Sequence, residues 1–447
     1  VTGLPDGMPD NCSWSGVIGF MSSKFLGLAL AMTLSVAHAQ AQSDLCGSAP
    51  DNGEVVSLSQ ATQRATMADL RPELATAEVR AARTERAIAA LRPADTVSLE
   101  IEDFPGTGIA SNIDSLQVTG SFSRVWERGG KREAREAVAN TAVDVAQTSF
   151  AAVQYAIREE VETLYAEAAL AERRVALACD RVALSSDLET AVKKRVEAAR
   201  DPLLAGARAS SDRLQAEADA RRNSVQARNL RAALGAYWQA EGDFQLDPNF
   251  LNEPLEPREV DFSELYAPEL DRLEAQRVRS SAQIELERSQ AIPDVTWSVG
   301  VRKFGIEDDL AVVGGASIPL GSANRSKASV TRARADQRRI DIEREVLRQK
   351  LLRRAVGYQR SAASALDGIE EIDTILLPSA TGAVDLARDG YVRGAFSYLD
   401  IVDAQRTVAI LREDRLTHLR TYILNEAALA RLTPPVDLPV TRTETPE

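Results

Sequence analysis

The chain has few aromatic residues, three cysteines and only two histidines. Of its 447 residues, 5% are aromatic although 44% are hydrophobic, and Ala, Arg and Glu are abundant. This composition suits long helices better than the compact core of a globular enzyme. The low count of large rings therefore favours an elongated, mainly α-helical protein.

Residues that could perform chemistry are also scarce. No Ser-His-Asp arrangement, phosphate-binding loop or metallohydrolase motif occurs in the sequence. No cluster of Cys, His or Met has the spacing of metal ligands. We therefore expect no enzymatic activity, no cofactor and no metal held by the protein. A formal net charge of −13, with Arg interleaved among Glu and Asp, argues against a nucleic-acid partner.

The N-terminal part resembles an export signal. We interpret residues 21–39 as a signal peptide, because residues 25–36 form a short apolar run and residues 37–39 form a small-x-small cleavage site. The mature chain is expected to begin near Gln40, and residues 1–20 are interpreted as the product of a mis-set start. Beyond the signal, no apolar run approaches the roughly 18–20 residues of a spanning helix. A membrane crossing would therefore have to use strands.

Two cysteines, Cys46 and Cys179, remain in the mature chain. An exported protein lies in an oxidising compartment, where two thiols tend to form a disulfide. Lipidation of Cys46 is the alternative. Ser43-Asp44-Leu45 lacks the small residue that normally precedes a lipidated cysteine, which weakens that alternative.

A long segment without helix breakers dominates the first half. Residues 131–201 contain no Gly or Pro, which predicts a helix of roughly 70 residues and about 105 Å. Its small and apolar residues recur at spacings of three and four, as in a coiled coil. Asp201 is expected to cap a returning helix that starts at Pro202 and runs to about Leu234. Together the two helices are expected to form a long hairpin over residues 131–234.

The same order of segments occurs twice. We divide the mature chain into a first repeat (40–240), a linker (241–264), a second repeat (265–432) and a flexible tail (433–447). Each repeat begins with a helix, at Leu58–Leu91 and Leu265–Gln290, which ends before a proline. Two strand-like runs and a long hairpin follow. The second hairpin spans 322–432 and contains Pro378, where we expect a kink.

The strand-like runs cover residues 96–102, 115–125, 295–304 and 310–320. In each run apolar and polar residues alternate over about 9 to 11 positions, the length of a tilted strand that crosses a bilayer. Four strands cannot close a barrel, and open edges in lipid leave backbone groups unpaired. Three copies would supply twelve strands for one shared barrel. The alternative is a soluble four-stranded sheet covered by helices.

Several motifs resemble those of the TolC-type outer-membrane efflux proteins, in particular their heavy-metal branch. The sequence Glu127-Arg128-Gly129-Gly130-Lys131-Arg132 matches a Gly-Gly-Lys-Arg signature where the second strand passes into the long helix. Ser317-Ile318-Pro319-Leu320 and the stretch from Gly390 to Gln405 are similar to general family patterns. The resemblance covers about residues 55–432.

The resemblance implies a fold, partners and a cargo. It implies a homotrimer with a 12-stranded β-barrel in outer-membrane lipid and a long coiled-coil α-barrel in the periplasm. The inner tip would meet a periplasmic adaptor, the membrane fusion protein, and an inner-membrane RND pump. The cargo would be heavy-metal cations. Alternatives are a drug or secretion channel of the same type, or a periplasmic coiled-coil protein without a pore.

The resemblance also assigns residues to the periplasmic entrance. Asp400 and Asp403 match positions of carboxylates that ring the entrance and attract cations. An exposed Asp near a helix start is otherwise an ordinary partner of the helix dipole. Tyr391 matches a tyrosine that ties neighbouring helices together when the entrance is closed.

The remaining entrance positions depart from the drug and toxin branch. Phe396 stands where those relatives have an arginine, and the equivalent place in the first hairpin is Arg200. Leu204 stands where an acidic partner is expected. We therefore expect the entrance not to close through the polar network of that branch. The hairpin tips, formed by Asp201 and Pro202 and by Gly394 to Ser397, match the positions that touch the adaptor.

Overall fold

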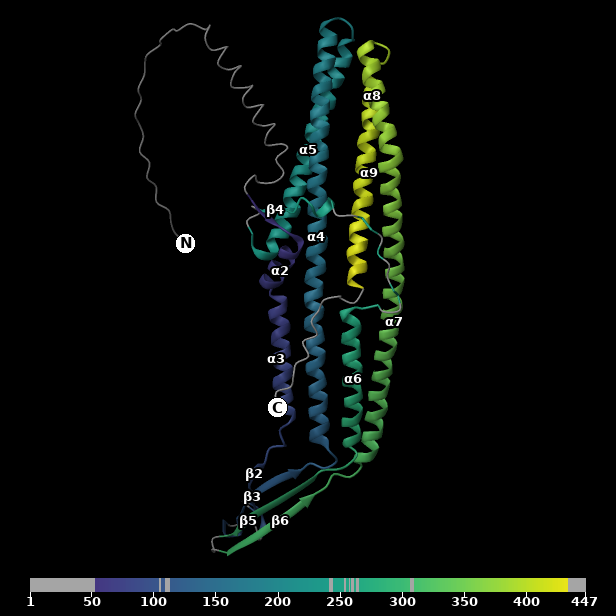
Figure 1. Ribbon diagram of the computed structural model, residues 1–447. Helices are drawn as coiled ribbons and strands as arrows, with labels where there is room; N and C mark the ends of the chain where they lie inside the picture. The colour runs from purple at the N-terminus through teal and green to yellow at the C-terminus, as the bar shows by residue number, and fades with distance from the viewer. Residues whose placement is uncertain are drawn as a thin grey trace, which may run out of the picture.

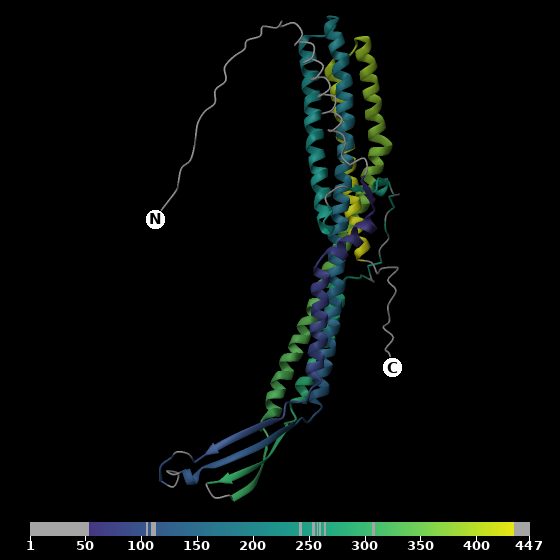
Figure 2. The ribbon, with the colours of Figure 1, turned by 90° about the vertical axis from the view of Figure 1, so that its left-hand side faces the viewer.

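The computed structural model describes residues 53–432, apart from 104–105, 109–112, 241–243, 253–254, 257, 259–260, 263–264 and 306–308. The predicted signal peptide, Cys46 and the tail 433–447 lie outside the described residues. The protein is elongated, with a small sheet at one end and two helical hairpin tips at the other (Figure 1). A view turned by 90° shows the sheet inclined to the helices (Figure 2).

The first half of the chain contains a short strand, two short helices, two strands and one long hairpin. These elements are β1 (Glu54–Val56), α2 (Leu58–Ala68), α3 (Arg71–Ala89), β2 (Thr96–Glu102), β3 (Gln117–Trp126), α4 (Lys131–Glu197) and α5 (Leu203–Gly235). A 3₁₀ turn, η2 (Ile113–Ser115), precedes β3, and another, η3 (Ala236–Trp238), follows α5. Helix α4 runs for 67 residues without a break, as expected from its lack of Gly and Pro.

The second half repeats this order after a connecting segment. That segment contains β4 (Phe244–Leu246) and the 3₁₀ turn η4 (Phe250–Asn252). The elements that follow are α6 (Pro268–Ser289), β5 (Val295–Phe304), β6 (Asp309–Ser317), α7 (Ser322–Glu371), α8 (Leu377–Arg393) and α9 (Tyr398–Arg431). None of the helices in the described ranges combines the length and the hydropathy needed to cross a membrane.

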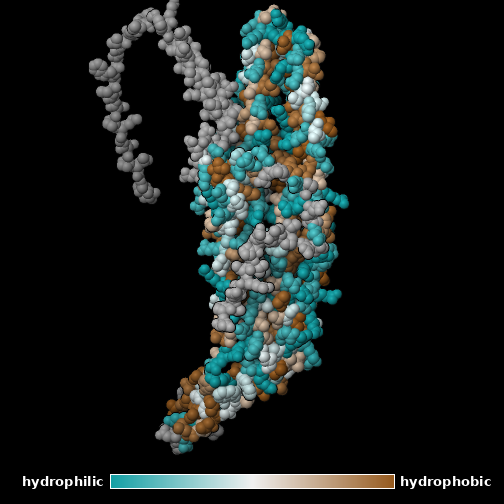
Figure 3. All heavy atoms as spheres, viewed as in Figure 1, coloured by the Kyte–Doolittle hydropathy of each residue, from teal (hydrophilic) through white to brown (hydrophobic). Residues whose placement is uncertain are grey.

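The four longer strands form one antiparallel sheet in the order β2-β3-β5-β6, so the two halves of the chain meet at β3 and β5. In this register Leu99, Gly120, Val301 and Val312 lie in one row. Leu99 and Val312 are 69% and 80% exposed, and hydrophobic residues gather over this sheet (Figure 3). The sheet therefore presents an apolar face that the chain itself does not cover.

The opposite face of the sheet is polar. Arg302 on β5 donates from Nε to Thr119 on β3 at 2.9 Å and forms an ion pair with Glu102 on β2 at 3.1 Å. Nearer the helices, the hydroxyls of Ser98 and Ser121 lie 2.8 Å apart. The sheet thus has the two unlike faces that the alternation predicts.

Two parts of the chain differ from the sequence-based expectation. The helix expected at 58–91 is broken at Asp69, because Pro72 cannot donate to the carbonyl of Ala68 and its ring would clash there. The linker expected to be irregular contains β4, which pairs in parallel with β1. Tyr165 secures this small sheet, since its hydroxyl donates to the carbonyl of Val56 at 2.8 Å and accepts from the Asp247 amide at 2.9 Å.

The helix changes locally just before Pro378, where a kink is expected. A π-helical turn, η5 (Ile372–Leu376), joins α7 to α8, and Pro378 lies in the first turn of α8. Proline removes an i→i−4 hydrogen bond, and the widened turn accommodates that loss without ending the helix. The helix thus continues past Pro378 by way of a π-turn.

Candidate functional site at the strand-to-helix junction and the hairpin tips

The Gly-Gly-Lys-Arg segment forms the junction between β3 and α4. Gly129 and Gly130 both have left-handed backbones, with φ of 79° and 69°. A Cβ on Gly129 would lie 2.9 Å from the Cβ of Ile292, whereas no comparable contact surrounds Gly130. Glycine is therefore required at position 129 both for its backbone and for the close approach of the second half of the chain.

The lysine of this segment connects the two halves of the chain. Lys131, whose side chain is 6% exposed, forms an ion pair with Asp294 at 2.8 Å, and the Arg128 amide donates to the same carboxylate at 3.0 Å. Arg135 pairs with Glu127. Arg132 is exposed and lies 3.6 Å from Glu133. The Gly-Gly-Lys-Arg segment thus fixes how β3 and β5 enter the helical part of the molecule.

At the other end of the molecule, Asp201 lies in the turn between α4 and α5. The prediction that Asp201 caps α5 is wrong: the N-cap is Pro202, and no side chain bonds the helix start. The carboxylate of Asp201 instead faces Arg195 and Tyr391. The carboxylate binds Arg195 in preference to the backbone amides at the start of α5, because a charged guanidinium donates stronger hydrogen bonds than an amide.

Arg195, Asp201 and Tyr391 form a polar network that joins the two tips. Arg195 donates to Asp201 from Nε at 3.0 Å and from Nη2 at 3.2 Å, and it donates from Nη1 to the carbonyl of Tyr391 at 2.9 Å. Its guanidinium also lies 4.3 Å from the centre of the Tyr391 ring. The Tyr391 hydroxyl donates to Asp201.

The network changes the acidity of its members. Hydrogen bonds from Arg195, supported by one from Tyr391, lower the pKa of Asp201 below its usual value. Burial, followed by the hydrogen bond to Asp201, raises the pKa of Tyr391. The carboxylate is therefore charged and the phenol neutral at physiological pH, as this network requires.

Packing and a second hydrogen bond support the tip network. Tyr398 donates to Asp212 at 2.5 Å, which links α9 to α5. A small buried cluster beneath it contains Val192, Ala209, Ala387, Tyr391, Tyr398 and Ile401. Sequence reasoning missed Arg195 and Asp212. Arg195 lies six residues before Asp201, a separation at which helical side chains do not meet, so only the turn brings them together.

The two aspartates expected at the entrance have different surroundings. Asp400 accepts from the Ser397 amide at 2.7 Å and from its hydroxyl at 2.8 Å, which completes a capping box at the start of α9. These bonds lower the pKa of Asp400. Asp403, one turn farther along α9, is exposed. Asp400 therefore has a helix-capping role beside any role in attracting cations.

The other expected tip residues lie close by but outside the network. Arg200 and Leu204 are exposed near the start of α5. Gly394 ends α8 with φ of 81°, as a left-handed C-cap. The ring of Phe396 covers Gly390 so closely that a Cβ there would lie 2.0 Å from a ring carbon. The hydrogen bonds described above between the tips therefore involve neither the Arg200 side chain nor Phe396.

Cys179 lies on α4, and it is disulfide-bonded. Cys46 is outside the described residues, so its pairing with Cys179 stays a prediction. Within the ranges that the structure describes, no group of three or more His, Cys, Asp or Glu is placed to hold a metal ion.

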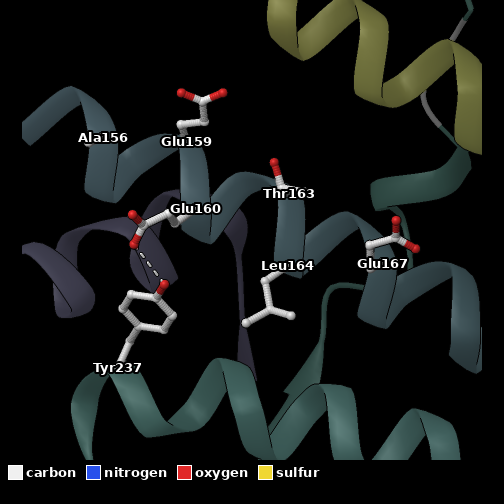
Figure 4. A pocket seen from close by; sticks show the side chains of 7 residues that line it. All are labelled: Ala156, Glu159, Glu160, Thr163, Leu164, Glu167 and Tyr237. Carbon is white, nitrogen blue, oxygen red and sulfur yellow. Dashed lines mark hydrogen bonds between the residues drawn. The ribbon is translucent and has the colours of Figure 1, made fainter.

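An open pocket of about 590 Å³ lies along the middle of α4. It is lined by Ala156, Glu159, Glu160, Thr163, Leu164, Glu167 and Tyr237. The Tyr237 side chain points to Glu160 across it, with a hydrogen bond of 2.9 Å (Figure 4). Each of its three glutamates pairs with an arginine, in the pairs Glu159–Arg431, Glu160–Arg71 and Glu167–Arg420. The pocket therefore has no carboxylate without a partner to offer a cation.

Comparisons with known proteins agree with this geometry. The family "Outer membrane efflux protein" matches residues 264–433. The cobalt-zinc-cadmium resistance protein CzcC of Cupriavidus metallidurans is 27% identical over 290 residues, which is 63% of this chain and 68% of that protein. The nickel-cobalt-cadmium resistance protein NccC of Alcaligenes xylosoxydans is 30% identical over 233 residues, 51% of this chain and 53% of that protein.

Solved structures share the fold. The crystal structure of CusC superimposes with a TM-score of 0.70 at 16% identity, covering 85% of this chain and 92% of that one. The outer membrane protein VceC of Vibrio cholerae gives a TM-score of 0.67 at 17% identity, covering 84% of this chain and 95% of that one. The two-faced sheet joined to very long helices is therefore a fold that this chain shares with these proteins.

The family match, the relatives and the shared fold together support a TolC-type outer membrane efflux protein. It is an efflux channel of the outer membrane that extends into the periplasm, and it is not an enzyme. Channels of this type are trimeric parts of tripartite efflux systems. The fold class and family inferred from the sequence are thereby confirmed.

Proposed function

We propose that three copies of this chain form an exit duct for heavy-metal cations. The observation that carries the proposal is the sheet, whose apolar face is exposed and whose two edge strands, β2 and β6, have no partner on their outer sides within the described residues. Lipid would cover the apolar face, and neighbouring copies would cover both edges. Twelve strands then enclose a polar lumen lined by residues such as Glu102 and Arg302.

The helices beside the sheet support the same assembly. Helices α3, α4, α6 and α7 pack in that order, so α3 and α7 lie at the two sides of the layer. On α3, Leu74 and Ile88 are exposed and lie fourteen residues apart, which places them at the same position of a coiled-coil repeat. On α7, Ile342 and Val346 are exposed and four residues apart. A heterologous contact between α3 of one copy and α7 of the next would bury both surfaces and close a ring.

The cargo and partners follow from the relatives and from the charge at the tips. The relatives' names attribute resistance to cobalt, zinc, cadmium and nickel to those proteins. Asp400 and Asp403, present in three copies, would concentrate cations at the periplasmic entrance. A periplasmic adaptor would contact the tips around Asp201, Pro202, Gly394 and Ser397, and an RND pump in the inner membrane would deliver the metal. A channel of this type that carries drugs or polypeptides is the second candidate.

Reversal potentials in planar bilayers test the proposal. Asp403→Asn should reduce the ratio of cation to anion permeability on the order of twofold, because three carboxylates leave the entrance. Asp403 is the cleaner position, since Asp400 also caps α9. Asp309→Asn, at the far end of β6, removes the same charge away from the tips and serves as a control. The cargo assignment fails if Asp403→Asn leaves the reversal potential unchanged, and the trimer assignment fails if the purified protein is a monomer in detergent.

A further inference from the structure

The contact between the two hairpin tips depends on one side chain that neither the signature nor the entrance motif contains. We propose that Arg195, rather than the hydrogen bond between Tyr391 and Asp201, is the residue that holds the two tips of each protomer together. The inference rests on the proposed function, because it assigns the control of that entrance. Arg195 is a positioning residue and does not need to touch the cargo.

The geometry gives Arg195 more connections than either of its partners. Its guanidinium binds the Asp201 carboxylate through two nitrogens and the Tyr391 carbonyl through the third. The same group lies over the Tyr391 ring, 4.3 Å from its centre. Arg195 therefore binds the loop of the first hairpin through Asp201. It also contacts the backbone carbonyl and the ring of Tyr391 in the second hairpin. A planar guanidinium can make these contacts together, whereas a lysine cannot.

The Tyr391 hydroxyl is less important in this arrangement. Removing the hydroxyl leaves all three hydrogen bonds of Arg195 in place, because two go to Asp201 and one goes to a backbone carbonyl. The aromatic ring, which also packs in the small cluster at the tips, remains as well. Removing the guanidinium leaves Asp201 with only the Tyr391 hydroxyl, and it removes both the hydrogen bond to the Tyr391 carbonyl and the contact with the ring. The two changes should therefore have unequal effects.

Arg195 also sets the charge at the tips. Its side chain is 20% exposed and that of Asp201 is 13% exposed, so the pair is partly shielded from water. The guanidinium neutralises Asp201, which then adds little to the negative potential made by Asp400 and Asp403. Loss of Arg195 would both loosen the tips and expose one more carboxylate per protomer.

The distance between the tips can be measured directly. Spin labels placed at Leu203→Cys and Val392→Cys, two exposed tip positions, report this distance in the purified full-length protein whether or not it conducts. The distance distributions of the labelled parent, Arg195→Met and Tyr391→Phe would be compared. Lys194→Met is the matched control, because it removes a positive charge from the neighbouring, exposed position.

We expect Arg195→Met to convert a narrow, short distance into a broad, longer one, and to raise channel open probability on the order of tenfold. Tyr391→Phe and Lys194→Met should keep the short tip distance of the parent, and their channel open probability should stay within about twofold of the parent's. Arg195→Lys, which keeps the charge and loses the planar fork, should lie between these limits and provides a second variant if Arg195→Met does not fold.

Three results would overturn the proposal. Tyr391→Phe could separate the tips as far as Arg195→Met does, which would assign the contact to the hydroxyl. Lys194→Met could also separate the tips as far as Arg195→Met does, which would show that the separation depends on the overall charge of the tips. Both Arg195 variants could keep the parent distance. If the parent shows a short tip distance but never conducts or forms trimers, the proposed channel fails while the assignment of Arg195 stands.

Discussion

The two ends of this molecule are held together by different kinds of contact. At the sheet end, β3 and β5 pair along ten residues, and the glycine-rich junction locks Lys131 onto Asp294. At the tip end, one guanidinium, two carboxylates and two tyrosine hydroxyls connect the hairpins over a small apolar cluster. Many cooperative backbone bonds resist separation, whereas a few side-chain bonds can be exchanged for water. We infer that the sheet end is permanent and the tip end is built to separate.

The largest effect is expected where a charge is placed on the apolar face of the sheet. Val312→Arg should prevent stable insertion, because an arginine in the middle of the lipid-facing band costs about 2–4 kcal/mol in each copy. Val313→Arg is the control, since its side chain lies on the polar face next to Gly300. The yield of trimer in outer-membrane fractions measures how well each of the two variants inserts. Equal yields would show that the sheet does not face lipid with the side that carries Val312.

Each repeat has a glycine where its second strand passes into its long helix, and we expect replacement of that glycine to be more harmful in the first repeat. Gly129 and Gly321 both have left-handed backbones, with φ of 79° and 83°, but only a side chain at 129 meets Ile292. Gly129→Ala should therefore be more destabilising than Gly321→Ala by about 1–3 kcal/mol, the cost of overpacking. Thermal unfolding of the two purified variants measures the difference. Matching melting temperatures would mean that the close approach at Ile292 is not tightly constrained.

The buried lysine of the junction should matter more than its exposed neighbour. Lys131→Met leaves the Asp294 carboxylate with only the Arg128 amide, which we expect to cost about 1–2 kcal/mol. Arg132→Met, at an exposed position, should change stability by less than about 0.5 kcal/mol. Denaturant midpoints of the two variants can be compared in detergent. The sheet end would be less dependent on this ion pair than proposed if the two midpoints coincide.

The smallest effect should be that of pH on the tips over the physiological range. The pKa of Asp201 is lowered, so its contribution to tip closure is complete above its ordinary value of 3.8 and is lost as pH falls through the lower value. The pKa of Tyr391 is raised above 10.0, so its contribution is complete below that value and is lost only at higher pH. The spin-label distance should therefore stay constant between about pH 5 and 9. A distance that increases between pH 7 and 5 would contradict this assignment of charges.

Much of the fold could be predicted because it depends on local pattern. The absence of Gly and Pro in 131–201 predicts the long helix, and the alternation at 96–102 and 295–304 predicts two-faced strands. The division into repeats at 40–240 and 265–432 remains a prediction, which the repeated order of helix, two strands and hairpin supports. The parallel pairing of β1 with β4 was missed because three-residue strands carry no periodic signal.

The candidate site was less predictable than the fold. The Gly-Gly-Lys-Arg motif marked Lys131 but gave no indication that Asp294, more than 160 residues away, is its partner. Tyr391 was identified through the resemblance, whereas Arg195 was not identified at all. Asp201 was assigned to the wrong partner, because a helix-capping rule considers only neighbours in the chain. Phe396 and Leu204 indicated that the entrance does not close through the polar network of the drug and toxin branch, but they gave no indication that Arg195 takes part in the contact between the tips.

By itself the sequence determined where the long helices and the four longer strands form, and that these strands have one apolar and one polar face. These properties depend on the spacing of residues along the chain, so they can be recognised without coordinates. Only the tertiary structure decided which charged groups meet, such as Lys131 with Asp294 and Arg195 with Asp201 and Tyr391. An ion pair depends on distances of a few ångströms between side chains from different elements, and no pattern along one segment determines those distances.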